Sequence, residues 1–374
     1  MKSLTRIDRS ELGRWWWTVD RWSLAALIVL MAFGIVLVLA AAPSAGARIG
    51  LEGFHLANRQ ILMLPLAILI LGAASLMQPR WLRRAALAGF VLSVLLCLLT
   101  LVAGPEIKGS TRWLNLGGFS LQPSELLKPC LAIVAAWIFA IGNEEPSFPS
   151  FRIAAVFWLV AVIPLLLQPD IGQAFVVTAV WSLQLFLAGL PMAWVGALIA
   201  GALVALVFAY LAFDHVSHRI NSFFDADAGD RYQVGRSLEA FHNGGLFGRG
   251  PGEGTVKDQL PDSHSDFIFA VAGEELGLLA CLVIVLLFGF VVLRGFARVR
   301  QDQSFFVLLA TAGLIAQFGL QAVINMASTL HLMPTKGMTL PFISYGGSSL
   351  LALALGMGWA LALTRRRGTL GETL

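Results

Sequence analysis

Long apolar runs alternate with short polar segments along almost the whole chain. A helix that crosses a membrane needs about 20 mostly apolar residues, and about ten runs approach that length. They lie near residues 22–42, 58–78, 85–104, 124–142, 153–168, 171–189, 191–213, 266–293, 303–330 and 341–363. The pattern therefore predicts an all-α integral membrane protein with about ten transmembrane helices.

One polar segment is much longer than the others and covers residues 214–265, between the seventh and eighth expected spans. The remaining organisation is simple: a polar amino-terminal tail (1–21), one membrane domain (22–363) and a polar carboxyl-terminal tail (364–374). No small-residue cleavage site precedes a short apolar core near the amino terminus. We therefore expect the first span to act as an uncleaved signal.

Composition supports the membrane assignment and excludes other classes. Hydrophobic residues make up 57% of the chain and charged residues 13%, whereas a soluble domain carries roughly 25% charged residues. Cys97, Cys130 and Cys281 lie inside apolar runs, which is typical of packing residues and gives no metal or disulfide spacing. The net charge of +4 follows from membrane orientation, and nothing else favours nucleic-acid binding.

Basic residues set the orientation, because cytoplasmic loops of membrane proteins are rich in Lys and Arg. With the amino terminus inside, the cytoplasmic segments contain Arg6, Arg9, Arg14, Arg21, Arg80, Arg83, Arg84, Arg294, Arg298, Arg300, Arg365, Arg366 and Arg367. An even number of spans returns the carboxyl terminus to the cytoplasm. Segments 105–123, 214–265 and 331–342 then face outward.

The first outward segment ends at a polar helix start, where Ser124 and Glu125 are typical of a capping residue and a first-turn acid. Lys128 follows at helical spacing, so it shares their face of the helix. Two interpretations stay open. The three residues form a local ion pair that seals the helix end, or Lys128 is a cation that attracts phosphate near the outer surface, which its position inside a span favours.

The long loop contains a glycine-rich string at residues 244–254. The string lacks the Gly-Lys-Ser/Thr ending of an ATP-binding loop. Tight turns or the close approach of a ligand explain it better.

The same loop ends at Asp262, His264 and Asp266, directly before the eighth apolar run. A divalent metal site is one interpretation, since Asp and His are suitable ligands. Asp266 is a stronger candidate for a general base, because an ionised carboxylate at the mouth of a helix suits proton abstraction. The alternative is a helix-capping Asp with no other role.

Two further features mark the last third of the chain. Glu274 and Glu275 lie within the eighth span, where acids are paired or face a cavity; Glu274, about 12 Å deeper than Asp266, is a structural or gating candidate. Prolines and glycines flank Lys336 within residues 333–349. They predict a broken or re-entrant segment, which is tolerated at membrane depth only where it lines a cavity.

Several of these segments together resemble the SEDS family of bacterial peptidoglycan polymerases, over essentially the whole chain. The motifs are Lys108-Gly109 with Arg112-Trp113, Gln122-Pro123-Ser124-Glu125, Gln168-Pro169-Asp170, Gly244 to Gly248, Leu260 to Glu275 and Leu340 to Ser349. Segments 250–257 and 334–341 are more similar to the FtsW branch, which serves cell division, than to the RodA branch.

The resemblance implies a ten-helix fold with both termini in the cytoplasm. It also implies that the acid of the motif His264-Ser265-Asp266-Phe267, Asp266, is essential for polymerising lipid II. Ser265 stands where the family usually has Thr, which keeps the hydroxyl. Gln173 replaces a usual Thr, and His242-Asn243 replaces a small residue and Ser. Neither of these two departures involves the expected base.

The implied enzyme is an inverting glycosyltransferase whose donor is linked to undecaprenyl diphosphate. We expect Asp266 to accept the proton of the attacking 4-hydroxyl, and cations to stabilise the diphosphate leaving group. The expected diphosphate or sugar contacts are Arg112, Trp113, Lys128, Lys336 and Ser344, supported by Glu125, His264 and Glu274. No cofactor is required by this chemistry, and a divalent cation (Mg²⁺ or Mn²⁺) is an optional helper.

Expected partners are lipid II, the nascent glycan, membrane lipids, a class B penicillin-binding protein that supplies transpeptidase activity, and other division proteins, but no nucleic acid. The expected location is the bacterial inner membrane at the septum. A lipid II flippase is a rival, because polar residues within spans suit transport as well. No internal repeat supports it. A RodA-type elongation polymerase and a transpeptidase scaffold are further alternatives, and the scaffold leaves Asp266 unexplained.

Overall fold

A computed structural model describes residues 10–48, 53–106, 109–117, 119–212, 229–299, 304–334 and 337–365, together with Ser217 and Asn221. Most of these residues are helical. The helices are α1 (Glu11–Thr18), α2 (Arg21–Arg48), α3 (His55–Leu76), α4 (Pro79–Ala103), α5 (Pro123–Glu144), α6 (Ser150–Leu167), α7 (Ile171–Leu187), α8 (Met192–Ala212), α10 (Gly229–Gly244), α11 (Ile268–Val299), α12 (Phe305–Thr329) and α13 (Gly347–Leu363). A short 3-10 helix covers Val256–Gln259, and a hairpin pairs β1 (Leu114–Leu116) with β2 (Phe119–Leu121).

The all-α membrane fold predicted from the apolar runs is confirmed. An apolar helix stands at each expected span, and seven described helices are long and apolar enough to cross a membrane, while α7 and α13 are apolar but shorter. The number of ten spans stays a prediction. Some boundaries differ: α4 begins six residues earlier than expected, at Pro79, and α13 begins six residues later, at Gly347, because residues 341–346 form turns and bends.

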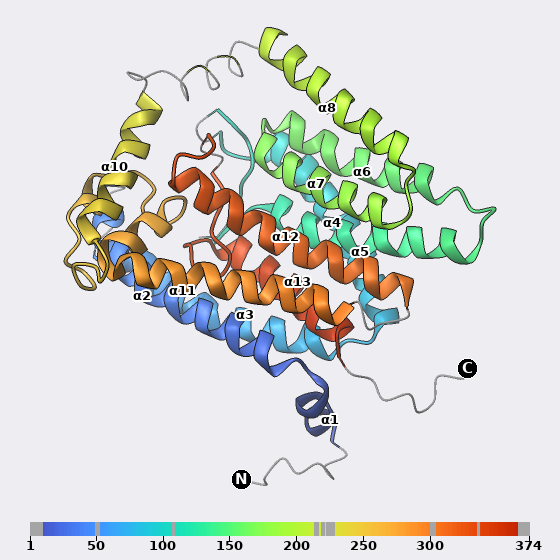
Figure 1. Cartoon of the computed structure of the whole chain (residues 1–374), viewed down its shortest axis with the longest axis horizontal. Coiled ribbons are helices and arrows are strands. Elements are labelled where there is room, and N and C mark those ends of the chain that lie inside the picture. Colours follow the sequence, from blue (N-terminus) through green and yellow to red (C-terminus); the bar gives the residue numbers. More distant parts are fainter. Residues whose placement is uncertain are drawn as a thin grey trace.

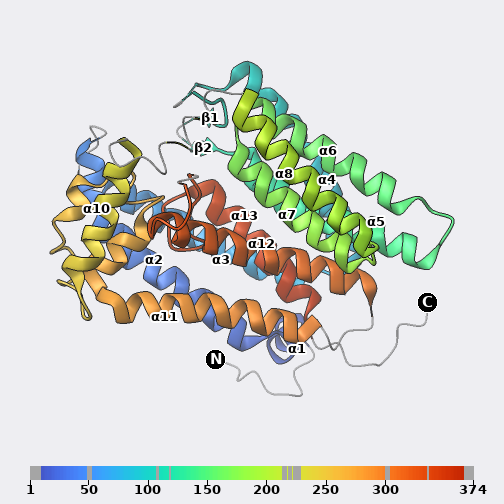
Figure 2. The ribbon, with the colours of Figure 1, turned by 45° about the horizontal axis from the view of Figure 1, so that its top comes forward.

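Helices α5 and α12 form the centre of the bundle. Most of their apolar windows are buried, 78% for α5 and 72% for α12, against 28% for α4 and for α11. Around this centre α4, α6 and α7 pack on one side, and α2, α3, α11 and α13 pack on the other (Figure 1). Figure 2 shows α10 and the β1–β2 hairpin at one end of the long helices, opposite α1.

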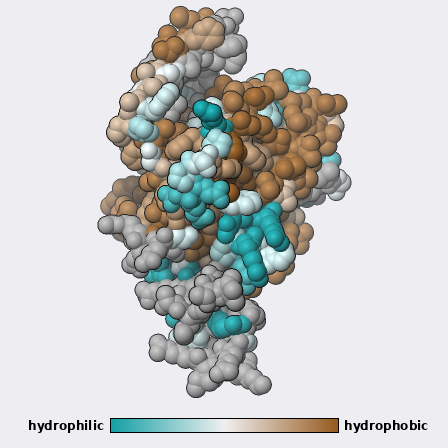
Figure 3. All heavy atoms as spheres, turned by 90° about the vertical axis from the view of Figure 1, so that its right-hand side faces the viewer, coloured by the Kyte–Doolittle hydropathy of each residue, from teal (hydrophilic) through white to brown (hydrophobic). Residues whose placement is uncertain are grey.

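The flanks of the bundle are apolar where they face outward. Leucines that a soluble protein would bury stand open on separate helices, for example Leu62 (72% exposed), Leu95 (58%) and Leu286 (61%). Figure 3 shows hydrophilic residues gathered in the middle of one end face, with hydrophobic residues beside and above them. This distribution matches a belt of lipid around the helices.

An ionic cluster joins the start of α2 to the end of α11. Asp20 precedes α2 and accepts bonds from Arg294 Nε at 2.7 Å and from Ser23 Oγ at 2.9 Å, with Arg298 Nη2 at 3.1 Å. Burial opposes ionisation of this carboxyl, but the two hydrogen bonds and the two arginine charges outweigh it and lower the pKa of Asp20. The cluster therefore fixes two helices that are far apart in sequence.

The amino-terminal segment is more ordered than a simple polar tail. Residues Glu11–Thr18 form α1, which Ser10 caps by accepting the Gly13 amide. Trp15 Nε1 donates to Ser75 Oγ at 2.8 Å and ties α1 to the end of α3. The interfacial-anchor interpretation of the three tryptophans stays a prediction.

Helix α11 is broken near its start, at Gly277, whose φ of 80° and ψ of 178° are not helical. The glycine-rich string supplies the bonds that the break removes. Arg249 N and Gly250 N donate to the carbonyls of Glu274 and Glu275, both at 3.0 Å, and Leu278 N and Leu279 N donate to Gly245 O and Leu246 O at 2.9 and 3.2 Å. The glycines in residues 244–254 thus allow close approach of the loop to α11.

We expect Gly277→Ala to destabilise the protein by about 1–3 kcal/mol, because alanine is strained at positive φ and its Cβ would overlap the backbone of Leu246 to Gly248. The measurement is the free energy of unfolding by SDS in mixed micelles. Gly289→Ala in the same helix is the matched control, since no atom lies within 4 Å of the added carbon. Equal stability of the two variants would contradict the tight fit at the break.

Candidate functional site

Asp266 lies in a turn, not on a helix. Residues 261–267 form consecutive turns and α11 begins at Ile268, two residues beyond the acid, so the prediction that its span starts at residue 266 is wrong. Asp262 takes a φ of 52°, and its carbonyl accepts the amides of Ser265 and Asp266, each at 3.0 Å. Asp266 is half-buried, so its side chain is placed by the turn and stays within reach of solvent.

A second segment, residues 337–346, lies against this turn. Ser344 Oγ donates to Ser265 O at 2.6 Å and accepts from Leu340 N at 2.7 Å, while Tyr345 N donates to His264 O at 2.9 Å. A Cβ on Gly337 would come within 3.7 Å of Asp266 Oδ2. Since its hydroxyl is engaged and 4% of the residue is exposed, Ser344 holds the acid's turn. Its predicted contact with substrate is not what this geometry shows.

Asn325 on α12 staples the two segments together. Its side-chain amide Nδ2 donates to Asp266 O at 2.9 Å and to Met338 O at 2.7 Å. Both carbonyls belong to irregular backbone, which needs partners from elsewhere in the fold when it is buried. Asn325 therefore fixes the main chain of the candidate base.

Helix α3 also reaches this site. Gln60 Nε2 donates to Ser344 O and Gln60 Oε1 accepts from Gly346 N, both at 3.4 Å. The Tyr345 ring lies beside the His264 ring, with centroids 5.4 Å apart. Burial raises the pKa of Tyr345 although the charge and hydrogen bond of Arg59 oppose this. Arg59 is thus a cation close to the Asp266 turn.

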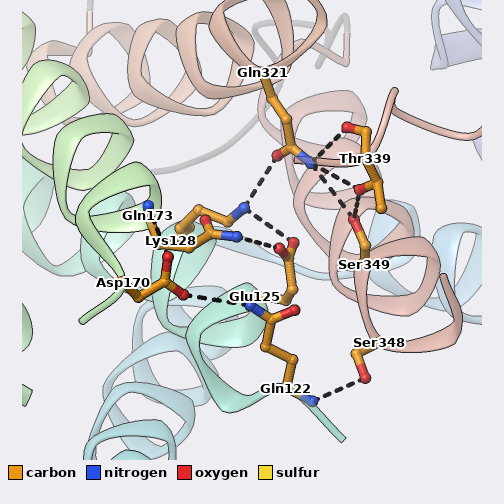
Figure 4. Close-up of polar contacts among 9 residues, drawn as sticks. All are labelled: Gln122, Glu125, Lys128, Asp170, Gln173, Gln321, Thr339, Ser348 and Ser349. Carbon is orange, nitrogen blue, oxygen red and sulfur yellow. Dashed lines mark hydrogen bonds and ion pairs between the residues drawn. The ribbon is translucent and has the colours of Figure 1, made fainter. Parts of the chain in front are cut away.

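A second cluster surrounds Lys128 and is almost completely buried (Figure 4). Lys128 Nζ lies 2.9 Å from Glu125 Oε2 and donates to Gln321 Oε1 at 3.1 Å. Gln173 Nε2 donates to Glu125 Oε1 at 2.7 Å. The ion-pair interpretation describes these contacts, and a direct contact of Lys128 with phosphate stays a prediction.

Arg112 and Asp170 form the outer part of the same cluster. Arg112 Nη1 lies 3.4 Å from Asp170 Oδ1, and Gln122 Nε2 donates to Asp170 Oδ2 at 3.5 Å. Burial raises the pKa of Asp170 although the charge of Arg112 opposes it. Arg112 and Trp113 are both half-buried, so they remain candidates for contact with a substrate.

Gln321 connects the Lys128 cluster to the segment around Asp266. Its Nε2 donates to Thr339 O at 3.2 Å and lies 3.5 Å from Ser349 Oγ, and the Thr339 and Ser349 hydroxyls are 2.8 Å apart (Figure 4). Ser348 Oγ accepts from Gln122 N at 3.0 Å and donates to Ser120 O at 3.0 Å. One polar network therefore joins the outer ends of α5, α12 and α13.

Glu274 anchors the long loop. The carboxylate accepts the amides of Thr255, Val256 and Lys257 at 2.8, 2.8 and 3.0 Å, and the residue is 0% exposed. Glu275 accepts Gly252 N at 2.7 Å and pairs with Lys257. These bonds give Glu274 the structural role that the sequence offered as one of two alternatives.

The structure brings the predicted residues together in three groups. Asp266, His264 and Ser344 share one, Arg112, Glu125 and Lys128 share another, and Glu274 holds the loop beside the first. Lys336 lies outside the described residues. Within the described part of the chain no three His, Cys, Asp or Glu side chains gather as a metal site, so Asp262, His264 and Asp266 do not form one.

Comparison with known proteins decides the family. The model of the FtsW/RodA/SpoVE family, described as "cell cycle protein", matches residues 21–368. The chain belongs to this family. A probable peptidoglycan glycosyltransferase FtsW of Caulobacter vibrioides is 43% identical, with 98% of this chain and 94% of the relative covered. A probable peptidoglycan glycosyltransferase FtsW of Geobacter metallireducens is 34% identical, with 94% and 97% covered. The resemblance to SEDS proteins is confirmed.

Solved structures of FtsW/RodA/SpoVE proteins share the fold. A chain from a peptidoglycan synthase complex that coordinates polymerization and crosslinking superposes with a TM-score of 0.77, at 28% identity, over 92% of this chain and 97% of the other. The crystal structure of the rod shape determining protein RodA of Thermus thermophilus gives 0.68, also at 28% identity, over 94% and 99%. The family fold therefore spans nearly the whole chain.

Sequence reasoning missed three residues of the site: Arg59, Asn325 and Gln321. All three are polar residues within or at the start of apolar helices, and that is a signal which could have found them. Their partners lie in segments far away in sequence, so pattern alone could not assign them a role.

We expect Lys128→Met to destabilise the protein by about 3–5 kcal/mol, because it leaves the buried Glu125 carboxylate without its counter-charge. The double variant Glu125→Gln with Lys128→Met should recover most of the loss. SDS titration of the wild type, both single variants and the double variant measures the coupling. Additive losses would show that the pair contributes nothing as a pair.

Proposed function

We propose that the chain is a peptidoglycan glycosyltransferase that polymerises lipid II into β-1,4-linked glycan. The observation that carries the proposal is the placement of Asp266: a half-buried carboxylate on a turn that Asn325 and Ser344 fix through the main chain. The names of the FtsW relatives support the same activity. A base held by its backbone needs little rearrangement before it accepts a proton.

In the proposed reaction, Asp266 accepts the proton of the GlcNAc 4-hydroxyl of lipid II while that oxygen attacks the anomeric carbon of the growing chain. A new C–O bond forms as the bond to the undecaprenyl diphosphate breaks. A single displacement of this kind inverts the α-linked donor to a β-linked product. The diphosphate leaves with the bonding electron pair and gains negative charge.

Cations near the turn suit that developing charge. Arg112 is half-buried and partly neutralised by Asp170, and Arg59 bonds to Tyr345 beside His264. Lys128 is 3% exposed, and in our proposal it acts by holding Gln321 and the 338–349 segment. Because the described residues do not gather as a metal site, no step of the reaction is routed through a metal ion.

The setting of the reaction follows from the topology of the spans. We place both termini in the cytoplasm and the Asp266 turn at the outer face of the bacterial inner membrane, where lipid II is used. The related chain solved within a peptidoglycan synthase complex supports a class B penicillin-binding protein as partner. Similarity to FtsW relatives supports work at the division septum, together with other division proteins.

We expect Asp266→Asn to lower the rate of polymerisation by about 10²–10⁴-fold, because the amide cannot accept the proton. The assay contains purified protein, its penicillin-binding partner and labelled lipid II, and glycan length is read on gels. Asp258→Asn is the matched control, since that acid is exposed in the same loop and should leave the rate near that of the wild type. Polymerisation by Asp266→Asn at the wild-type rate would remove the assigned base, and transbilayer movement of lipid II without polymer would favour a flippase.

Asn325→Leu should lower kcat by about 10–100-fold with a smaller change in KM, because the base loses its fixed main chain and shifts. Steady-state kinetics with labelled lipid II separate the two constants. Asn143→Leu, an exposed change at the far end of α5, controls for handling of the variants. A raised KM with unchanged kcat would instead make Asn325 a substrate-binding residue.

A further inference from the structure

A small closed cavity lies inside the bundle, between α5, α7 and α12. Four polar side chains line it among apolar ones: Lys128, Trp181, Gln184 and Gln317. Their exposed fractions are 3%, 6%, 0% and 4%. The space open to the centre of a water molecule is about 10 Å³, which is roughly the room that one buried water needs.

Lys128 brings an unused donor to this cavity. An ammonium group has three N–H donors. Among the described residues, two oxygens are in contact with Nζ: Glu125 Oε2 at 2.9 Å and Gln321 Oε1 at 3.1 Å. One N–H of a side chain that lines the cavity therefore has no partner within the described part of the chain.

The other three polar side chains have the same need. Trp181 Nε1, Gln184 Oε1 and Gln317 Oε1 are buried atoms with no hydrogen-bond partner among the described residues. The orientation of Gln184 is fixed, since its Nε2 donates to Ala132 O at 2.7 Å and Leu309 O at 3.0 Å. Each unmet buried polar atom costs about 1–3 kcal/mol, so the cavity concentrates an unsatisfied demand.

We infer that the cavity binds one ordered water molecule. It accepts hydrogen bonds from Lys128 Nζ and Trp181 Nε1 and donates hydrogen bonds to Gln184 Oε1 and Gln317 Oε1. The two lone pairs and two protons of water match these two donors and two acceptors one for one. A cation in this space would be repelled by the ammonium group, and an anion would face the two carbonyl oxygens.

The water gives Lys128 a third partner within the apolar interior. Glu125 neutralises the ammonium charge, Gln321 links it to Thr339 and Ser349, and the water completes its hydrogen bonding. The site is thus the inner end of the network that holds the 338–349 segment. This inference does not depend on the enzymatic activity proposed for Asp266.

Radical footprinting of the full-length protein in lipid nanodiscs tests the site, because ionising pulses convert bound water into hydroxyl radicals that oxidise adjacent side chains. Trp181 should be oxidised several times faster than Trp359. Trp359 is the matched control: it is 1% exposed, and its indole nitrogen is also buried with no partner among the described residues, but it does not line this cavity. Equal oxidation of the two tryptophans would overturn the inference.

A variant and a map give independent evidence. Gln317→Met keeps the length of the side chain and removes an acceptor that bonds to no described residue, so it should reduce oxidation of Trp181 severalfold and leave Trp359 unchanged. An unchanged rate at Trp181 in a folded variant would contradict the site. A high-resolution electron cryomicroscopy map of the wild type should show a peak within hydrogen-bond distance of Lys128 Nζ and Gln184 Oε1, and an empty cavity there would overturn the inference.

Discussion

Backbone amides and carbonyls cannot stay unbonded in a bilayer, because hydrocarbon offers them no partner. Most of this protein meets that constraint with regular helices. Two segments do not: α11 is interrupted at Gly277, and residues 337–346 have no helical bonds of their own. Each segment is completed by polar groups from another part of the chain. The arrangement of the outer end of the molecule depends on these borrowed bonds.

The two irregular segments meet at the Asp266 turn. The glycine-rich string completes the break in α11, which follows the turn, while Asn325, Ser344 and Gln60 complete residues 337–346. A helix could not present the acid in this way, because its amides and carbonyls would be used within the helix. Irregular backbone leaves carbonyls that Asn325 and Ser344 can grip from two directions. The cost in local regularity yields a precisely placed carboxylate.

Much of the fold follows from sequence, since apolar runs of span length have few alternatives in a chain so poor in charge. Helix ends were less predictable: α13 starts only at Gly347 because the apolar residues before it, such as Phe342 and Ile343, are buried as turns and not as helix. The importance of Asp266 was visible from its position after a long polar loop. The partners of the glycine-rich string and the roles of Asn325 and Gln321 were not, because each depends on contacts between distant segments.

The anchoring of the long loop has a mechanical consequence. Glu274 and Glu275 bind the loop through several main-chain bonds, the string from residue 244 to 250 is hydrogen-bonded across the break, and Val256 and Leu260 pack with Phe267 in a separate small core. The loop from α10 onward and the first turns of α11 therefore form one rigid body, hinged at Gly277. A force applied to the outside of this body is delivered directly to the turn that bears the acid. Any partner that grips the loop holds a lever on Asp266.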